Sequence, residues 1–223
     1  MPARTSPAAQ DYLKALYQLA AEGAEAADGI TTTAVAHRMD VSAASATNML
    51  KRLEGMGLVD YIPYQGAGLT EAGRKIALEV IRHHRLLETY LAEALGVPWD
   101  AVHEEAEVLE HVLSEDLEDR MAALLGDPST DPHGHPIPAK DGSMPSSSAR
   151  RLWEVADGQW AEVERVSDSS AESLRYLAGI GVRPGVTVEV VRRGPLSGPL
   201  FVRVGGDAEQ ALSKELAEDV WVA

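Results

Sequence analysis

The residues best suited to chemistry lie between positions 103 and 111, where the sequence reads HEEAEVLEH. If this segment is one helix, four side chains of metal-binding type share one face, at i, i+4, i+7 and i+8: His103, Glu107, Glu110 and His111. An apolar stripe that includes Leu109 brings part of this acidic face close to the core. Carboxylates and imidazoles crowded beside a core repel one another and lose hydration unless a cation lies between them. The pattern therefore indicates a divalent-metal site.

A solvated acidic helix with two incidental histidines would show the same spacing. A second copy of the pattern favours the metal site, because His84 and Glu88 stand four residues apart on the preceding predicted helix. Six of the seven histidines lie between positions 83 and 135. The connection over 127–149 contains DPHGHP at 131–136, which is either a linker or a rigid loop whose aspartate and histidines reach a metal.

Composition limits the classes of protein to which the chain can belong. Its 223 residues leave room for two or three small compact units. Because there is no cysteine, disulfides, thiolate metal sites and cysteine nucleophiles are excluded. Neither a signal-peptide pattern nor an apolar run of membrane-spanning length is present, which predicts a cytoplasmic protein without a membrane partner.

The net charge of −15 is concentrated in the middle of the chain. Residues 76–139 carry 3 Lys/Arg against 14 Asp/Glu, whereas residues 1–75 carry 7 against 8. The first segment can therefore approach phosphates, and the acidic middle segment matches the expected metal site.

The first 73 residues show the pattern of a DNA-binding unit. Apolar spacing predicts helices over 8–22, from Thr31 or Thr32 to 39, and over 42–56, and the tight turn over 39–42 makes the last two a helix-turn-helix. The early polar face of the last helix offers groups suited to base edges and phosphates: Ser42, Ala44, Ser45, Thr47, Asn48, Lys51 and Arg52. An ordinary helical hairpin could share this face. A strand over 61–64, a turn over 65–68 and a return at 69–70 favour a winged helix instead.

The remainder divides into a helical part and a strand-rich part. Helices are expected from about 70 to 95, after Asp100, and over about 114–125. From Trp153 the period changes to two, with strands expected over 161–166, 186–193, 200–204 and 220–222 and a helix over 169–177, which fits a small β-barrel. The predicted fold is mainly α with small β, in domains 1–73, 74–140 and 153–223 with a linker over 141–152.

This order of elements resembles the metal-dependent repressors of the diphtheria-toxin-repressor family, over essentially the whole chain. The most specific matching pieces are Asp11-Tyr12-Leu13, Gly57-Leu58-Val59, His84–Glu88, Val102–Ala106 and Leu109–His111. The segment LRYLAGIGVRPG at 174–185 is similar to the family's SH3-like, or FeoA-like, barrel. The resemblance implies a winged helix-turn-helix, a helical metal-binding and dimerisation domain, and this C-terminal barrel.

The resemblance also implies membership of the manganese-sensing branch. Iron sensors place a Met in the first helix and a Cys four residues after the first metal-helix histidine, where this chain has Asp11 and Glu107. Carboxylates suit a harder ion than sulfur does. The implied primary ligands are Asp11, His84, Glu107, Glu110 and His111. One manganese-sensor subgroup has a further acid three residues after the aspartate, and Lys14 at that position disfavours its paired two-metal cluster.

A second metal site follows from the same resemblance. Family patterns suggest Glu88 and His103, but the barrel ligands of iron sensors correspond here to Ser170 and Ser173. A manganese-sensor arrangement that uses the 131–136 loop makes Asp131 and His133 candidates together with Glu88. The barrel would contribute Asp168, which we rank above Glu172.

The function that this family implies is metal-dependent repression of transcription. We expect a homodimer, paired through residues of about 74–126, that binds palindromic double-stranded operator DNA when loaded with Mn²⁺ and controls genes of metal-ion transport. Without metal, repulsion among the acids would leave the first helix loosely held. Fe²⁺ is the alternative activator, and Zn²⁺, Co²⁺ and Cd²⁺ are expected to bind in vitro. No enzymatic activity and no small-molecule substrate are expected.

The alternative from another class is a metal-dependent hydrolase with a structural winged helix. Glu107 stands where a zinc-protease helix needs its second histidine. Neither His84 nor His111 has the Glu three residues before it that a di-iron carboxylate bundle requires. A third class is a constitutive winged-helix protein with a structural metal, and assays with and without a chelator separate the three.

Overall fold

The computed structural model describes residues 5–23, 29–63, 65–145, 147–196, 198–206 and 208–223. The chain forms two compact units, each assembled from separate segments. Unit 1 consists of Met1–His83, Glu110–Val112 and Pro138–Ser143, and unit 2 consists of His84–Leu109, Leu113–Ile137 and Met144–Ala223. Among the described residues, no helix is long and apolar enough to cross a membrane.

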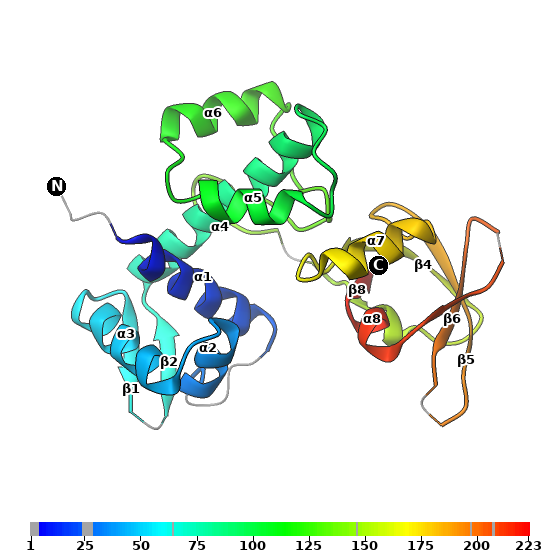
Figure 1. The fold of residues 1–223 in the computed structure, drawn as a ribbon, viewed down its shortest axis with the longest axis horizontal. Coiled ribbons are helices and arrows are strands. Elements are labelled where there is room, and N and C mark those ends of the chain that lie inside the picture. The colour runs from blue at the N-terminus through cyan, green and yellow to red at the C-terminus, as the bar shows by residue number, and fades with distance from the viewer. Residues whose placement is uncertain (1–4, 24–28, 64, 146, 197, 207) are drawn as a thin grey trace. The chain divides into compact units, whose positions relative to one another are not determined.

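Unit 1 contains a helix-turn-helix, drawn in blue and cyan in Figure 1. The helices are α1 (Pro7–Ala21), α2 (Thr32–Arg38) and α3 (Ala43–Gly55). Helix α2 begins at a predicted cap, because Thr31 Oγ1 accepts from Ala34 N at 3.1 Å. Helix α3 begins after Ser42, whose Oγ accepts from Ser45 N at 3.2 Å. The inner faces of the three helices bury a common apolar core that includes Leu13, Val35 and Leu50.

An antiparallel hairpin follows α3 as the wing. It pairs β1 (Val59–Ile62) with β2 (Gly66–Leu69), so both strands begin earlier than predicted, and Tyr64 lies outside the described residues. The strand starts at Val59 because burial of Val59 and Tyr61 anchors it to the core. Gly66 has φ 158°, and an added Cβ would lie 2.8 Å from the Gly29 carbonyl carbon, so the second strand needs glycine there.

Helix α4 (Glu71–Glu93) begins after Thr70, whose Oγ1 accepts from Gly73 N at 3.1 Å. The boundary between the two units falls within this helix, after His83. In unit 2, its last turns pack with α5 (Val102–Leu109) and α6 (Glu115–Leu124). The shared core consists of Leu86, Leu87, Ala106, Leu113, Met121 and Ala122.

The predicted single helix from His103 to His111 is wrong at its end. Helix α5 stops at Leu109, and Glu110 and His111 lie in the turn that follows, so the four expected ligands do not share one helical face. The next helix begins after Ser114, which caps α6. In a continuing helix, the Glu110 carbonyl would accept a hydrogen bond from the amide four residues later. Here His83 Nδ1 donates to that carbonyl instead, at 3.1 Å.

The C-terminal part of unit 2 is a six-stranded antiparallel sheet in the order β3-β8-β4-β5-β6-β7, with α7 and α8 (Figure 1). The bounds are β3 Arg150–Arg151, β4 Gln159–Val166, β5 Thr187–Arg193, β6 Leu200–Val204, β7 Gln210–Leu212, β8 Val220–Val222, α7 Ala171–Gly179 and α8 Lys214–Glu218, and a 3₁₀ turn spans Leu152–Glu154. The four predicted strands and the helix are present within two residues. The short elements β3, β7 and α8 escaped prediction because two to five residues carry too little periodicity.

Candidate metal centre

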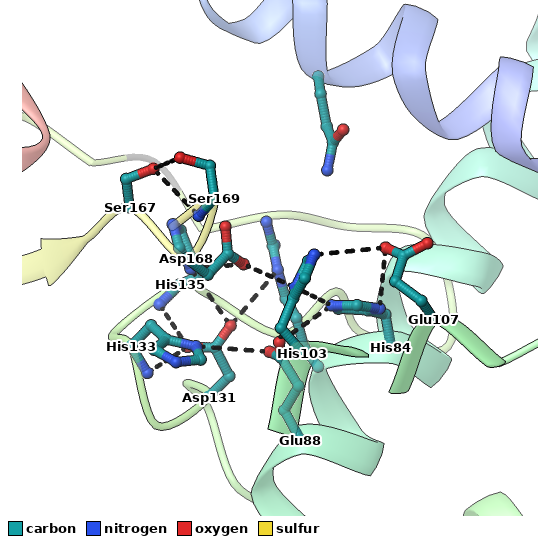
Figure 2. A network of polar contacts seen from close by, with 12 residues as sticks. His84, Glu88, His103, Glu107, Asp131, His133, His135, Ser167, Asp168 and Ser169 are labelled. Atoms are coloured by element: carbon teal, nitrogen blue, oxygen red, sulfur yellow. Dashed lines mark hydrogen bonds and ion pairs between the residues drawn. The ribbon is translucent and has the colours of Figure 1, made fainter. Parts of the chain in front are cut away.

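In unit 2, acids and histidines from four segments point toward one another (Figure 2). Helix α4 contributes His84 and Glu88, and α5 contributes His103 and Glu107. The 131–136 loop and the residue two positions after β4 complete the set with Asp131, His133, His135 and Asp168. All of these residues belong to the same compact unit.

Glu88 lies at the centre of this network and is completely buried. Its Oε1 is 3.0 Å from His84 Nε2 and 3.2 Å from His103 Nδ1, and its Oε2 is 3.7 Å from His133 Nδ1. Burial by itself raises the pKa of the Glu88 carboxyl, but the hydrogen bonds with His103 and His84 and the ion pair with His133 outweigh it and hold the pKa well below its usual range. Glu88 is therefore an anion inside the protein.

The 131–136 loop is fixed by its own backbone. Asp131 Oδ1 accepts from the amides of His133 at 2.8 Å and His135 at 2.9 Å, which leaves Oδ2 pointing elsewhere. Val166 N donates to the His133 carbonyl at 2.9 Å and joins the loop to β4. Gly134 has φ 88°, and an added Cβ would lie 2.1 Å from the Glu164 carbonyl oxygen, so only glycine permits this close approach.

The orientation of His133 suits a metal ligand. Its Nε2 donates to the Trp99 carbonyl at 2.7 Å, and its ring stacks on the Trp99 ring with centroids 5.6 Å apart. In the neutral ring, Nδ1 would therefore carry the lone pair, and it faces Glu88. Burial alone lowers the pKa of His133, but the contact with the Glu88 carboxylate and the charges of Asp131 and Asp168 raise it to about 9.

Four buried oxygen and nitrogen atoms that could coordinate a metal have no hydrogen-bond partner within the described part of the chain: Glu88 Oε2, Asp131 Oδ2, His133 Nδ1 and His135 Nδ1. These atoms face one another as ion pairs, Glu88 with His133 and Asp131 with His135, but without hydrogen-bond geometry, and buried polar atoms without hydrogen bonds are costly. Asp168 lies beside them, with Oδ2 at 3.6 Å from His103 Nδ1 and 3.9 Å from His135 Nδ1. Burial raises the pKa of Asp168, but the nearby charges, His135 foremost, lower it overall. A divalent cation coordinated by oxygen and imidazole nitrogen fits this donor set.

Unit 1 holds a separate donor cluster formed by Asp11, Glu110 and His111. His111 Nε2 is 2.9 Å from Asp11 Oδ1 and 3.6 Å from Glu110 Oε1, and its Nδ1 is 2.7 Å from Gln10 Oε1. Lys14 Nζ donates to Glu110 Oε2 at 2.8 Å. These contacts join α1 to the 110–112 turn.

The predicted primary ligands belong to both units. Of the primary set, Asp11, Glu110 and His111 come together in unit 1. In unit 2, His84 Nδ1 is 3.6 Å from Glu107 Oε1. The candidates for the second site all belong to the network around Glu88: Glu88, His103, Asp131, His133 and Asp168.

The predicted ligand sets left out several residues that the structure places in these clusters. The DPHGHP pattern suggested that its histidines could reach a metal, and His135 Nδ1 lies 3.3 Å from Asp131 Oδ2. The partnership of Lys14 with Glu110 spans 96 residues, so no local pattern reveals it. The same holds for Trp99, whose backbone carbonyl orients His133.

The predicted DNA-reading residues lie on or beside the first turns of α3. Ser42, Ala44, Ser45, Asn48, Lys51 and Arg52 are exposed, and Thr47 is half-buried with Oγ1 donating to the Ala43 carbonyl. Buried Ala46, Leu50 and Leu53 occupy the opposite face of the helix and hold it against the core. The polar face is therefore presented to solvent in unit 1.

Three family models match consecutive parts of the chain. They are described as iron-dependent repressor, N-terminal DNA-binding domain, at residues 4–67; iron-dependent repressor, metal-binding and dimerisation domain, at 70–139; and FeoA domain, at 150–223. Similar curated proteins include the iron-dependent repressor IdeR of Mycobacterium leprae, 32% identical over 95% of this chain and 94% of that protein. The diphtheria toxin repressor of Corynebacterium jeikeium is also 32% identical, over 81% of this chain and 83% of that protein.

Solved structures share the architecture over nearly the full chain. A manganese-dependent transcriptional repressor in complex with manganese is 40% identical, with a TM-score of 0.88, and covers 96% of this chain and 99% of its own. ScaR with bound Cd²⁺ is 33% identical, with a TM-score of 0.80, and covers 96% and 98% respectively.

Proposed function

The chain belongs to the diphtheria-toxin-repressor family of metal-dependent transcriptional repressors, and from this premise we propose that it represses transcription in response to Mn²⁺. The observation that carries the proposal is the set of four buried donor atoms around Glu88 that lack hydrogen-bond partners. The donors are carboxylate and imidazole only, which suits Mn²⁺ better than a sulfur-rich site would. Metal binding explains why these carboxylates and imidazoles are grouped, so we propose no enzymatic activity.

For the activating ion we propose Asp11, His84, Glu107, Glu110 and His111 as ligands. A second ion would take Glu88, His103, Asp131, His133 and Asp168. When bound, each ion would supply positive charge that offsets the repulsion among these carboxylates. His133 and Asp131 are already oriented for this by Trp99 and by the loop amides. Fe²⁺ is the alternative activator, and Cd²⁺, Zn²⁺ and Co²⁺ would compete in vitro.

For DNA we propose that α3 is the recognition helix of a homodimer. Its small polar side chains, Asn48 among them, would contact base edges, and Lys51 and Arg52 would contact phosphates. Two recognition helices in a dimer read half-sites about one turn of DNA apart, so a palindromic operator is expected. Such a protein acts in the cytoplasm, on genes of metal-ion transport.

We also propose functional domains 1–73, 74–140 and 153–223, joined by a linker over 141–152. The spans of the three family models support these boundaries. The residues that bind DNA and those that hold metal then fall in different domains, which is the arrangement that a metal-controlled repressor needs.

The test is DNA binding under controlled metal supply. DNA selected from a genomic pool in the presence of Mn²⁺ would be titrated by fluorescence anisotropy with the full chain and Mn²⁺, Fe²⁺, Zn²⁺ or a chelator. We expect tight binding with Mn²⁺ and binding at least about tenfold weaker with chelator. Equal binding in both conditions would contradict the proposal and favour a constitutive DNA-binding protein.

A further inference from the structure

The donor cluster of unit 1 contains a buried ammonium group. Lys14 and Asp11 lie three residues apart on α1, so their side chains are neighbours on the helix. Lys14 is only 7% exposed, and its Nζ lies 2.8 Å from Glu110 Oε2 and 3.1 Å from Glu110 Oε1. Glu110 is 1% exposed. Lysine is rarely buried to this extent unless it is paired, so the ion pair with Glu110 is an integral part of the cluster.

The ion pair involves the carboxylate that a divalent ion would need. A buried carboxylate is costly without a counter-ion, and Lys14 supplies one to both oxygens of Glu110. Glu110 Oε1 also faces His111 Nε2, which contacts Asp11. An ion held by Asp11, Glu110 and His111 must therefore share Glu110 with the ammonium group and tolerate its positive charge at short range.

We propose that Lys14 is a tethered cation that competes with metal for Glu110. Before metal binds, it neutralises Glu110 and holds α1 to the 110–112 turn. It weakens the affinity of this cluster for a divalent ion, and it occupies the space beside Glu110 that a second ion would require. This inference rests on the proposed function, because it assigns a metal threshold and a one-ion limit to the primary site.

A purely structural lysine would behave differently. Its removal would destabilise the metal-free and metal-loaded chains equally and leave metal affinity unchanged. Removal of a competing cation takes positive charge away from Glu110, and a bound divalent ion can replace that charge only in the metal-loaded state. By linkage, Mn²⁺ must then bind more tightly and stabilise the variant more than it stabilises the unmodified chain.

The experiment compares the full chain with Lys14→Gln, Lys14→Glu and Lys75→Gln. Lys75 is the control, because its ammonium group is exposed and lies 3.9 Å from Glu71 on α4. Mn²⁺ affinity and ion count would be measured from the electron paramagnetic resonance of free Mn²⁺, and thermal unfolding would be followed with chelator and with Mn²⁺. We expect Lys14→Gln to lower the primary-site Kd about tenfold. Its ion count should not change, and its Tm should rise further with Mn²⁺. Lys14→Glu should bind one additional ion per chain, and Lys75→Gln should match the unmodified chain.

An unchanged Kd in Lys14→Gln, or an unchanged ion count in a folded Lys14→Glu, would overturn the proposal. If Lys14→Glu does not fold, the Kd of Lys14→Gln alone decides. Failure of the proposed function is distinguishable, because the unmodified chain would then bind no Mn²⁺ or would bind DNA equally well with chelator.

Discussion

At the scale of single residues, charge is balanced within each cluster by partners distant in the sequence. Glu88 stays ionised because three imidazoles surround it, and Glu110 is paired with Lys14. The same atoms are the ones that a divalent ion would contact. In the proposed function, protons and the Lys14 ammonium group would balance these carboxylates before metal binds, and a divalent ion would do so afterwards.

We predict that selectivity between metals depends on two side chains of the proposed primary set, Asp11 and Glu107. We expect Glu107→Cys combined with Asp11→Met to shift activation from Mn²⁺ toward Fe²⁺, because sulfur donors replace hard oxygens. The measurement is the ratio of DNA affinities with Mn²⁺ and with anaerobic Fe²⁺, and Glu105→Cys, at an exposed position of α5, is the control. A ratio that does not change would show that the surroundings of the ligands set selectivity.

The metal-free protein should lose stability as the pH rises, through His133. Its folded pKa of about 9 lies above the usual 6.5, so its protonated form stabilises the fold fully below pH 6.5. That contribution, up to about 3 kcal/mol, is lost as the pH rises through 9. Urea unfolding with chelator at pH 6.5, 8 and 9.5 measures it. The decrease should be smaller in His133→Asn but unchanged in His37→Asn, which alters an exposed residue of α2. A parallel decrease in His133→Asn would assign the effect elsewhere.

At the scale of elements, the 131–136 loop holds two imidazoles and an aspartate in place through one glycine. We expect Gly134→Ala to cost about 2 kcal/mol or more and to remove one bound Mn²⁺ per chain, because the new Cβ collides with the Glu164 carbonyl. Gly158→Ala is the matched control: φ is also positive, at 79°, but an added Cβ meets no heavy atom within 4 Å. It should cost about 1 kcal/mol and retain every ion. Full metal occupancy in Gly134→Ala would exclude the loop from the second site.

Two substitutions in α3 should have different effects, one on the affinity for all DNA and the other on the preference for the operator sequence. We expect Lys51→Ala to weaken binding to all DNA sequences and to reduce the salt dependence by about one phosphate contact. Asn48→Ala should weaken operator binding by about 1–3 kcal/mol while changing non-specific binding little. Anisotropy titrations at several salt concentrations, with operator and scrambled DNA, measure both effects. A change in sequence preference alone in Lys51→Ala would contradict its phosphate role.

The elements that sequence predicted well are those whose signals are local. The cap at Thr31, the alternation of β5 and the apolar spacing of α4 each act within a few residues, so their positions could be predicted. The end of α5 could not, because it depends on His83, which donates to the Glu110 carbonyl from another helix. Spacing alone predicted that His84, Glu88, His103 and the 131–136 loop could bind metal, but their grouping with Asp168 came from the resemblance. The geometry of the set depends on contacts such as that of His133 with Trp99.

At the scale of the whole molecule, metal and DNA must affect each other reciprocally. If Mn²⁺ tightens operator binding by some factor, operator DNA must tighten Mn²⁺ binding by the same factor, about 5- to 150-fold for typical coupling energies. The two factors would be measured at one pH and one salt concentration, from DNA titrations with and without Mn²⁺ and from Mn²⁺ titrations with and without operator. Scrambled DNA of equal length is the control, because its phosphates also attract free Mn²⁺. We expect operator to lower the Mn²⁺ Kd well beyond the effect of scrambled DNA. Equal effects of the two DNAs would mean that metal occupancy is not linked to the operator-bound state, and that metal stabilises the fold without controlling repression.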